Sequence, residues 1–202
     1  AENIAMVSQM LDGRVFAGFA RGYQPRWVNV IGQHVGLADP ASGPEYEDLK
    51  RELFEEHFDI IMKAWSHDTF RHEGKHWTIP TKDIHWAAAE VAHKYGQGVD
   101  ENDQVVEIGI APPTHEKQIP DMFMPFATSE RSIRWGMERD IVPVTILTDP
   151  DVTHSQFIAG QEAAAAAGRD LKFGERMAMS REIIVADTDA EAEALAREAG
   201  SF

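Results

Sequence analysis

The chain contains no cysteine in its 202 residues. This absence excludes disulfide-stapled scaffolds, thiolate metal sites and cysteine nucleophiles. A reducing cytoplasm is the natural setting for such a composition, and we expect a cytoplasmic location. Hydrophobic residues make up 43% of the chain, enough for a packed core. No apolar run approaches the roughly 18 residues of a membrane-spanning helix.

Basic residues are scarce as well. Lysine and arginine number 19 against 34 aspartates and glutamates, which gives a formal net charge of −15. Nucleic acids and anionic membranes are bound by clustered cations, so this balance argues against both as partners. An anion site in this chain would therefore be local and made by few groups.

The motifs of several enzyme classes are also missing. The chain has no Gly-x-Ser-x-Gly, no Walker-type loop and no Gly-x-Gly-x-x-Gly. Its nine histidines show neither His-Glu-x-x-His nor facial-triad spacing, so we predict no metal site. His72 and His76, which flank a predicted hairpin turn, are interpreted as solvated side chains.

Strand and helix patterns alternate along the chain, which predicts an α/β fold with a parallel sheet. The predicted helices are residues 2–11, 45–65, 129–138, 154–167 and 189–199, with a short one at 86–94. The predicted strands are residues 14–20, 122–126, 142–147 and 182–186, with a hairpin at 69–79 and a long loop at 21–44. Residues 66–120 are interpreted as an insertion, because they are too short and polar for a core of their own.

The first candidate site lies in residues 13–23, Gly-Arg-Val-Phe-Ala-Gly-Phe-Ala-Arg-Gly-Tyr. Both faces of residues 15–20 are apolar, as in a strand covered on two sides, and polar residues resume at Arg21. Ligands of parallel α/β proteins bind at the carboxyl ends of strands, where an arginine suits a phosphate. The alternative is that Arg21 pairs with a carboxylate in a loop.

A second candidate site lies where the strand 122–126 passes into a helix. Thr128, Ser129 and Ser132 place hydroxyl groups beside the free N–H groups of the first helical turn, which attract an anion. The alternative is an ordinary N-cap by Thr128 or Ser129. Arg21 would also lie at a strand's carboxyl end, so these groups are predicted to converge on one phosphate. Trp27, in the predicted long loop, is the aromatic residue that we place near a substrate.

The order of these features resembles the luciferase-like flavin-dependent monooxygenases. Leu11-Asp12-Gly13-Arg14 and residues 18–23 are similar to the segment around the fourth strand of that family. Residues 54–65, followed by Phe70, Gly74, Lys75 and Trp77, are similar to what comes next. Residues 129–135 resemble its phosphate-binding helix start, and residues 185–192 resemble a late strand–helix signature. The matches span nearly the whole chain in the right order.

The resemblance implies a TIM-type (β/α)8 barrel, present here only from about the fourth strand onward. Residues 1–202 would be a single luciferase-like domain, incomplete at both ends, because a closed barrel takes about 250 residues. By position, Arg21, Ser129 and Ser132 would hold the phosphate of FMN, with Thr128 beside them. The catalytic base stays unassigned, since much of the flavin pocket would lie in the missing strands.

The implied activity is a monooxygenase reaction in which reduced FMN and dioxygen oxygenate a hydrophobic organic substrate. Reduced flavin often comes from a separate reductase in this family, and homodimers are usual, so we expect both partners. The alternatives are a hydride-transfer oxidoreductase with a deazaflavin coenzyme, and a non-catalytic flavin-binding barrel. Some members place a cysteine just before the motif arginine, where this chain has Ala20.

Overall fold

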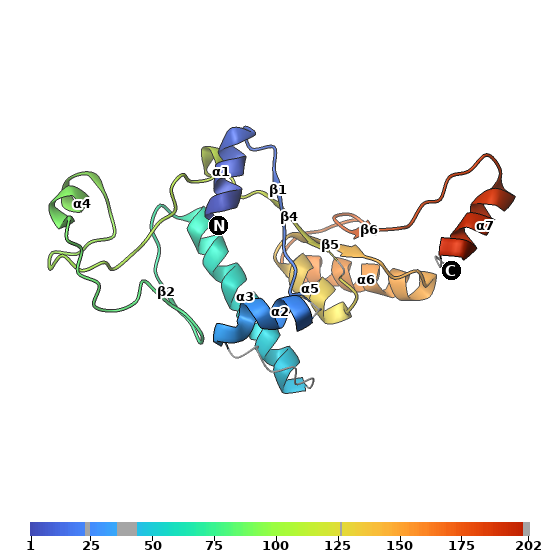
Figure 1. Cartoon of the computed structure of the whole chain (residues 1–202), viewed down its shortest axis with the longest axis horizontal. Coiled ribbons are helices and arrows are strands. Elements are labelled where there is room, and N and C mark those ends of the chain that lie inside the picture. The colour runs from blue at the N-terminus through green and yellow to red at the C-terminus, as the bar shows by residue number, and fades with distance from the viewer. Residues whose placement is uncertain (23–24, 36–43, 126, 200–202) are drawn as a thin grey trace. The chain divides into compact units, whose positions relative to one another are not determined.

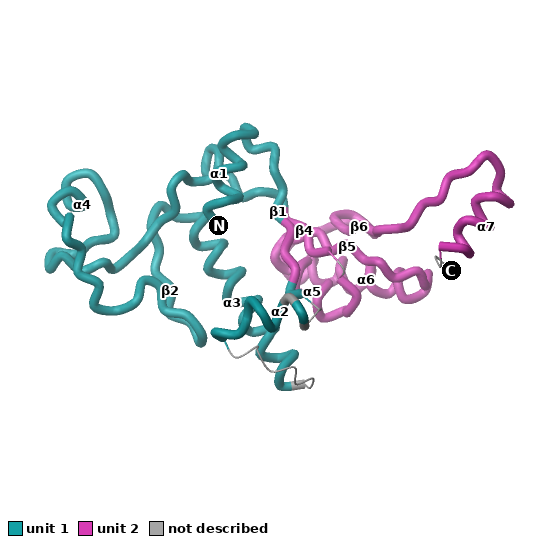
Figure 2. The backbone as a smooth tube through the Cα atoms, viewed as in Figure 1, with its two compact units in different colours: residues 1–17, 21–121 teal, residues 18–20, 122–202 magenta. Residues whose placement is uncertain are grey.

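The computed structural model describes residues 1–22, 25–35, 44–125 and 127–199. Contacts divide the chain into two compact units, residues 1–17 with 21–121 and residues 18–20 with 122–202 (Figure 2). Because compact units can belong to one domain, the single luciferase-like domain and its insertion stay predictions.

The first unit is mainly helical and carries the long helix α3, Pro44–Ser66 (Figure 1). Glu45 and Glu47 in its first turn and Lys63 in its last turn complement the helix dipole. Leu53 is buried on its apolar stripe, as the helical spacing predicts. The other helical segments of this unit are α1 (Glu2–Met10), α2 (Pro25–Gly32), η1 (Gln33–Val35), α4 (Ala89–Tyr95) and η2 (His115–Lys117).

The segment 21–44 is not a continuous loop, since α2 and η1 occupy residues 25–35 within it. Proline and glycine misled the prediction, because both are typical of loops. At a helix start, however, the fixed φ of proline suits the first turn, and glycine is common near the end. Pro25 and Gly32 hold those two positions in α2. Residues 36–43 lie outside the described part of the chain.

The predicted hairpin at residues 69–79 is confirmed by two antiparallel strands, β2 (His72–Glu73) and β3 (Thr78–Ile79). The interpretation of its histidines as solvated is wrong for His72, which is 7% exposed. His72 Nε2 lies 3.0 Å from Glu56 Oε1 on α3. That partner is distant in sequence, so no local pattern signals the burial.

The strands of the second unit belong to a sheet with the strand order β1-β4-β5-β6 (Figure 1). The strands are β1 (Phe16–Gly18), β4 (Asp121–Pro125), β5 (Ile141–Thr145) and β6 (Ala178–Met179). β4 and β5 pair in parallel from Met122 opposite Ile141 to Pro125 opposite Val144, and β5 pairs in parallel with β6. The predicted α/β fold with a parallel sheet is therefore confirmed.

Helices α5 (Glu130–Glu138) and α6 (Pro150–Ala166) follow β4 and β5 and pack on each other. Ile133 and Met137 of α5 are almost fully buried, and so is Ala164 of α6. The two helices come close at Gly160, where an added Cβ would lie 3.3 Å from Ile133 Cγ2. This layer forms the core of the second unit.

Two strand predictions need correction. Residues 14–20 form only the three-residue β1, in which Ala17 is buried while Phe16 is 66% exposed. Apolar residues on both faces of a strand do not ensure that other elements cover both faces. Among the described residues, only the face that carries Ala17 is covered.

Residues 182–186 form no strand, although their alternating β-branched residues favour one. A strand also needs a partner, and the pairing with β5 is made earlier, by β6. Ile183 and Val185 are consequently more than four-fifths exposed. The final helix is confirmed as α7, Asp189–Ala199. Among the helices of the described part, none has both the length and the apolar character needed to cross a membrane.

Candidate functional site

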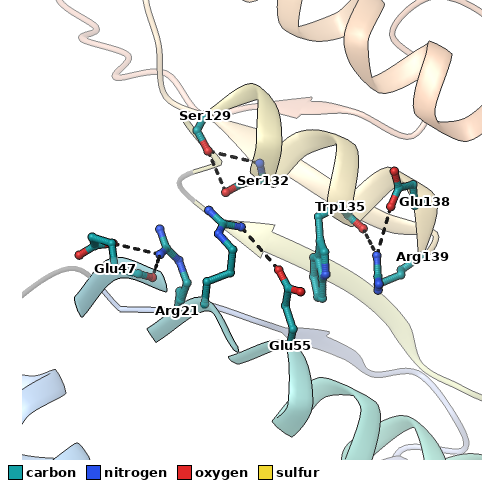
Figure 3. Close-up of polar contacts among 9 residues, drawn as sticks. Arg21, Glu47, Glu55, Ser129, Ser132, Trp135, Glu138 and Arg139 are labelled. Carbon is teal, nitrogen blue, oxygen red and sulfur yellow. Dashed lines mark hydrogen bonds and ion pairs between the residues drawn. The ribbon is translucent and has the colours of Figure 1, made fainter. Parts of the chain in front are cut away.

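The second unit places hydroxyl groups at the carboxyl end of a parallel strand. After β4, the N–H of Ala127 donates to the carbonyl of Val144 at 3.1 Å, which extends the pairing with β5. Ser129 then caps α5, because its Oγ accepts from the N–H of Ser132 at 3.3 Å. The two hydroxyl groups also meet, with Oγ atoms 2.9 Å apart (Figure 3). Sequence reasoning predicted this helix start and its cap correctly.

The start of α5 is electrostatically suited to an anion. The first N–H groups of a helix have no acceptor within it, and the helix dipole is positive at this end. Glu130 brings a negative charge to the first turn, but its Oε1 lies 2.7 Å from Arg134 Nε. Arg134 also pairs with Glu162, and the hydrogen bonds that Arg134 donates to these two carboxylates raise its pKa. Arg134 is shared by the two carboxylates, so these three side chains keep one net negative charge, and the attraction for an anion comes from the first N–H groups and the helix dipole.

Thr128 lies beside this cap and is exposed, as is Ser129. Its carbonyl oxygen accepts a hydrogen bond from Gln156 Nε2 at 2.8 Å. Thr128, Ser129 and Ser132 are thus brought together at one helix start. This arrangement fits a phosphate, whose oxygens accept hydrogen bonds from hydroxyl and N–H donors alike.

Arg21 belongs to the first unit and is partly buried, with a side chain 28% exposed. Its Nη1 lies 3.0 Å from Glu47 Oε2 on α3 (Figure 3). Lys50 Nζ lies 2.9 Å from Glu47 Oε1. Arg21 therefore has a carboxylate partner, which lies on a helix and not in a loop, and its role toward a phosphate stays a prediction. The hydrogen bond from Lys50, with the charge of Arg21 adding to it, lowers the pKa of Glu47.

Two cations share the single carboxylate of Glu47, so the cluster of Arg21, Lys50 and Glu47 carries a net positive charge. Gly22, with φ of +76°, turns the backbone directly after Arg21, in a conformation that favours glycine. The convergence of Arg21 with the hydroxyl groups of α5 stays a prediction. Trp27 has its backbone in α2, while its side chain lies outside the described part.

Sequence reasoning missed one residue in the first turn of α5 and one on α6 that contacts Thr128, the residue before the α5 cap. Arg131 is exposed in the first turn, where a cation opposes the helix dipole and an acidic residue is usual. Such a local conflict is itself a signal of function. Gln156 is 4% exposed on α6. Its signal is a polar side chain on the stripe that continues through the buried Gly160 and Ala163.

The family model of luciferase-like monooxygenases matches residues 1–201 of the chain. The chain therefore belongs to the luciferase-like monooxygenase family.

Among curated relatives from Pseudomonas putida, 3,6-diketocamphane 1,6-monooxygenase is 28% identical over 200 residues, covering 98% of this chain and 49% of that protein. The 2,5-diketocamphane 1,2-monooxygenase 1 is 25% identical over 211 residues, covering 99% of this chain and 48% of that protein. The chain thus spans about half the length of the curated relatives it matches.

Solved structures of monooxygenases are also similar to this chain. The oxygenating constituent of 3,6-diketocamphane monooxygenase from Pseudomonas putida, a type II Baeyer–Villiger monooxygenase in complex with FMN, superposes with a TM-score of 0.64. It is 26% identical, and the match covers 96% of this chain and 47% of that one. Monooxygenase RslO1 from Streptomyces bottropensis is 17% identical and superposes with a TM-score of 0.65. This match covers 99% of this chain and 50% of that one, and it supports the fold alone. The prediction of a partial luciferase-like TIM barrel is confirmed, and the described residues form no closed barrel.

Proposed function

We propose that this chain supplies the FMN phosphate site of a flavin-dependent monooxygenase that oxygenates a hydrophobic organic substrate. The observation that carries the proposal is the family match, which extends over residues 1–201. The diketocamphane monooxygenases among its relatives, one of them solved with FMN, indicate this flavin rather than a deazaflavin coenzyme.

The residues at the start of α5 fit the phosphate of FMN. Ser129 and Ser132 offer hydroxyl donors, the first turn offers N–H donors, and Thr128 and Arg131 are exposed beside them. Arg21 would add a charged donor from the end of β1, since its cluster with Lys50 and Glu47 retains positive charge. When bound in reduced form, FMN supplies the electrons that activate dioxygen. The protein's own contribution is to bind the phosphate, orient the ring and exclude water.

The relatives suggest a ketone as the substrate class. Their names describe oxygenation of diketocamphanes, and one is a Baeyer–Villiger enzyme, which inserts an oxygen atom beside a carbonyl group. We propose a cyclic aliphatic ketone for this protein, bound near Trp27. A separate flavin reductase, a homodimeric assembly and a cytoplasmic location complete the proposal.

Oxygen labelling tests the activity. Full-length protein supplied with reduced FMN and ¹⁸O₂ is expected to convert a cyclic ketone to a lactone carrying one ¹⁸O atom, detected by mass spectrometry. Reduction of oxygen without labelled product, across a panel of ketones, would contradict a Baeyer–Villiger reaction. Hydride transfer from a reduced deazaflavin coenzyme without oxygen would move the assignment to that alternative.

A further inference from the structure

A buried chain of hydrogen bonds in the second unit ends at the residue before the α5 cap. Gln156 Nε2 donates to the carbonyl oxygen of Thr128 at 2.8 Å, and Gln156 Oε1 accepts from Thr145 Oγ1 at 3.1 Å. Thr145 Oγ1 in turn accepts from the N–H of Leu147 at 3.2 Å. Gln156 is 4% and Thr145 1% exposed, so both lie away from solvent. The chain links α6 and the carboxyl end of β5 to the loop that precedes α5.

The bond from Gln156 fixes the direction of one peptide group. In a trans peptide the C=O and N–H point in opposite directions. Because the carbonyl of Thr128 points to the buried Gln156, the N–H of Ser129 points the opposite way, toward the exposed side of the loop. Ala127 is fixed on one side by Val144, and Ser129 on the other by Ser132. Three successive residues of the loop are thus anchored, and Gln156 anchors the middle one.

We propose that Gln156 is a positioning residue for the FMN phosphate. It holds the Thr128–Ser129 peptide so that the N–H of Ser129 and the first turn of α5 face the phosphate. The inference rests on the proposed function, because it takes the start of α5 as the phosphate site. Gln156 itself touches no part of the flavin and acts through the peptide that it orients.

An amide is required at this position, since one atom must donate and the other must accept. Methionine has a similar length but neither capacity, so Gln156→Met releases the Thr128 carbonyl while keeping most of the packing. Thr145→Val leaves the bond to Thr128 in place and removes the hydroxyl group that donates to Gln156 Oε1 and accepts from the N–H of Leu147. It provides a milder disturbance of the same chain of bonds.

The chain offers a matched control in the same helix. Gln161 is also a glutamine of α6, and its Nε2 donates to the carbonyl of Leu171 at 2.8 Å, in the segment that follows the helix. Gln161→Met therefore removes the same kind of bond from the same helix, and leaves the bonds of Thr128 intact. A general loss of stability would appear in both variants.

The test compares FMN with riboflavin, which has no phosphate, in the full-length protein. Dissociation constants for both reduced flavins are measured for wild type and for Gln156→Met, Thr145→Val and Gln161→Met, together with each melting temperature. We expect Gln156→Met to weaken FMN binding about tenfold, as one hydrogen bond to the phosphate loses its alignment. Riboflavin binding should stay unchanged. Thr145→Val should shift the FMN-to-riboflavin ratio in the same direction by less, and Gln161→Met should not shift it.

Equal weakening of both flavins by Gln156→Met, or no weakening of either, would overturn the positioning role. If Gln156→Met does not fold, an unchanged ratio in Thr145→Val overturns it instead. A wild-type protein that binds riboflavin as tightly as FMN would show that the phosphate site itself is wrongly assigned, and the role of Gln156 would fall with it.

Discussion

At the scale of single residues, Arg21 offers the most direct test of the proposed phosphate site. Arg21→Ala should weaken binding of reduced FMN by about 2 kcal/mol, because a charged donor to the phosphate is lost. Arg14→Ala is the matched control, since Arg14 is 75% exposed and its Nη1 lies 3.8 Å from Asp12 Oδ2. An anaerobic fluorescence titration measures both variants. An Arg21→Ala protein with the wild-type dissociation constant would remove this residue from the phosphate site.

Glu56 is a second residue with a defined task, which is to fasten the hairpin to α3. Its carboxylate accepts from His72 Nε2 at 3.0 Å and from the backbone N–H groups of His76 and Trp77 at 2.9 and 2.8 Å. A Cβ at Gly74 would collide with Glu56 Oε1, so the turn needs glycine to approach this closely. Burial acts to raise the pKa of Glu56, but the three hydrogen bonds outweigh it and leave the pKa lowered.

Glu56→Gln should destabilise the protein by about 2 kcal/mol, because a charged acceptor of three hydrogen bonds is replaced by a neutral amide. Glu55→Gln alters a long ion pair, in which Arg51 Nη1 lies 3.8 Å from Glu55 Oε1, and should cost less than about 1 kcal/mol. Urea unfolding of both variants at neutral pH measures the difference. Equal effects of the two substitutions would contradict a fastening role for Glu56.

The stability that Glu56 contributes to the fold should depend on pH. A carboxyl with a lowered folded pKa stabilises the fold above its unfolded pKa, and the contribution fades as pH falls through the folded value. The reference pKa of Glu56 is 4.5, so the stability gap between wild type and Glu56→Gln should be full at pH 6 and shrink below pH 4.5. A gap that grows on acidification would contradict the lowered pKa.

At the scale of elements, the side-chain caps of α5 and α6 in the second unit can be compared directly. Ser129 caps α5, and Asp149 caps α6 by accepting from the N–H groups of Asp151 and Val152 at 2.9 and 3.0 Å. Ser129→Ala and Asp149→Ala should each cost about 1 kcal/mol of stability. Only Ser129→Ala should also weaken FMN binding, because only α5 starts at the proposed phosphate site.

Unfolding curves and FMN titrations of the two cap variants separate these roles. The two variants should lose similar stability but differ in their effect on FMN binding. If both caps affect FMN binding equally, the hydroxyl group of Ser129 acts through the fold and has no direct part in binding.

The helices whose ends and apolar stripe are marked in the local sequence were predicted correctly. α3, α5, α6 and α7 follow from helical spacing, caps and charged ends, and the parallel sheet follows from the alternation of strands and helices. Extended segments were predicted less well, because a strand depends on a partner that the local sequence does not specify. Residues 182–186 have the composition of a strand, yet β6 makes the pairing with β5.

The candidate site also has a part that the local sequence predicts and a part that it does not. The cap by Ser129 and the hydroxyl pair with Ser132 follow from spacing within one helix turn. The pairing of Arg21 with Glu47 and the bond from Gln156 to Thr128 join residues 26 and 28 positions apart. Such contacts depend on packing between elements, and no short motif encodes them.

At the scale of the whole molecule, the family assignment is combined with one proposed cofactor site. The chain belongs to the luciferase-like monooxygenases over residues 1–201. In its second unit, the parallel strand β4 is followed by the start of α5, which is rich in hydrogen-bond donors. The net charge of −15 makes the rest of the chain a poor general anion binder. A phosphate should therefore be held only where donors are concentrated.

The most direct test is an anaerobic titration of the full-length protein with reduced FMN, with reduced riboflavin and a reduced deazaflavin coenzyme as competitors. The account predicts that FMN binds most tightly, and that admitting oxygen in the presence of a ketone then consumes the reduced flavin and yields oxygenated product. Tighter binding of the deazaflavin coenzyme, or no preference for FMN over riboflavin, would contradict the proposed cofactor site.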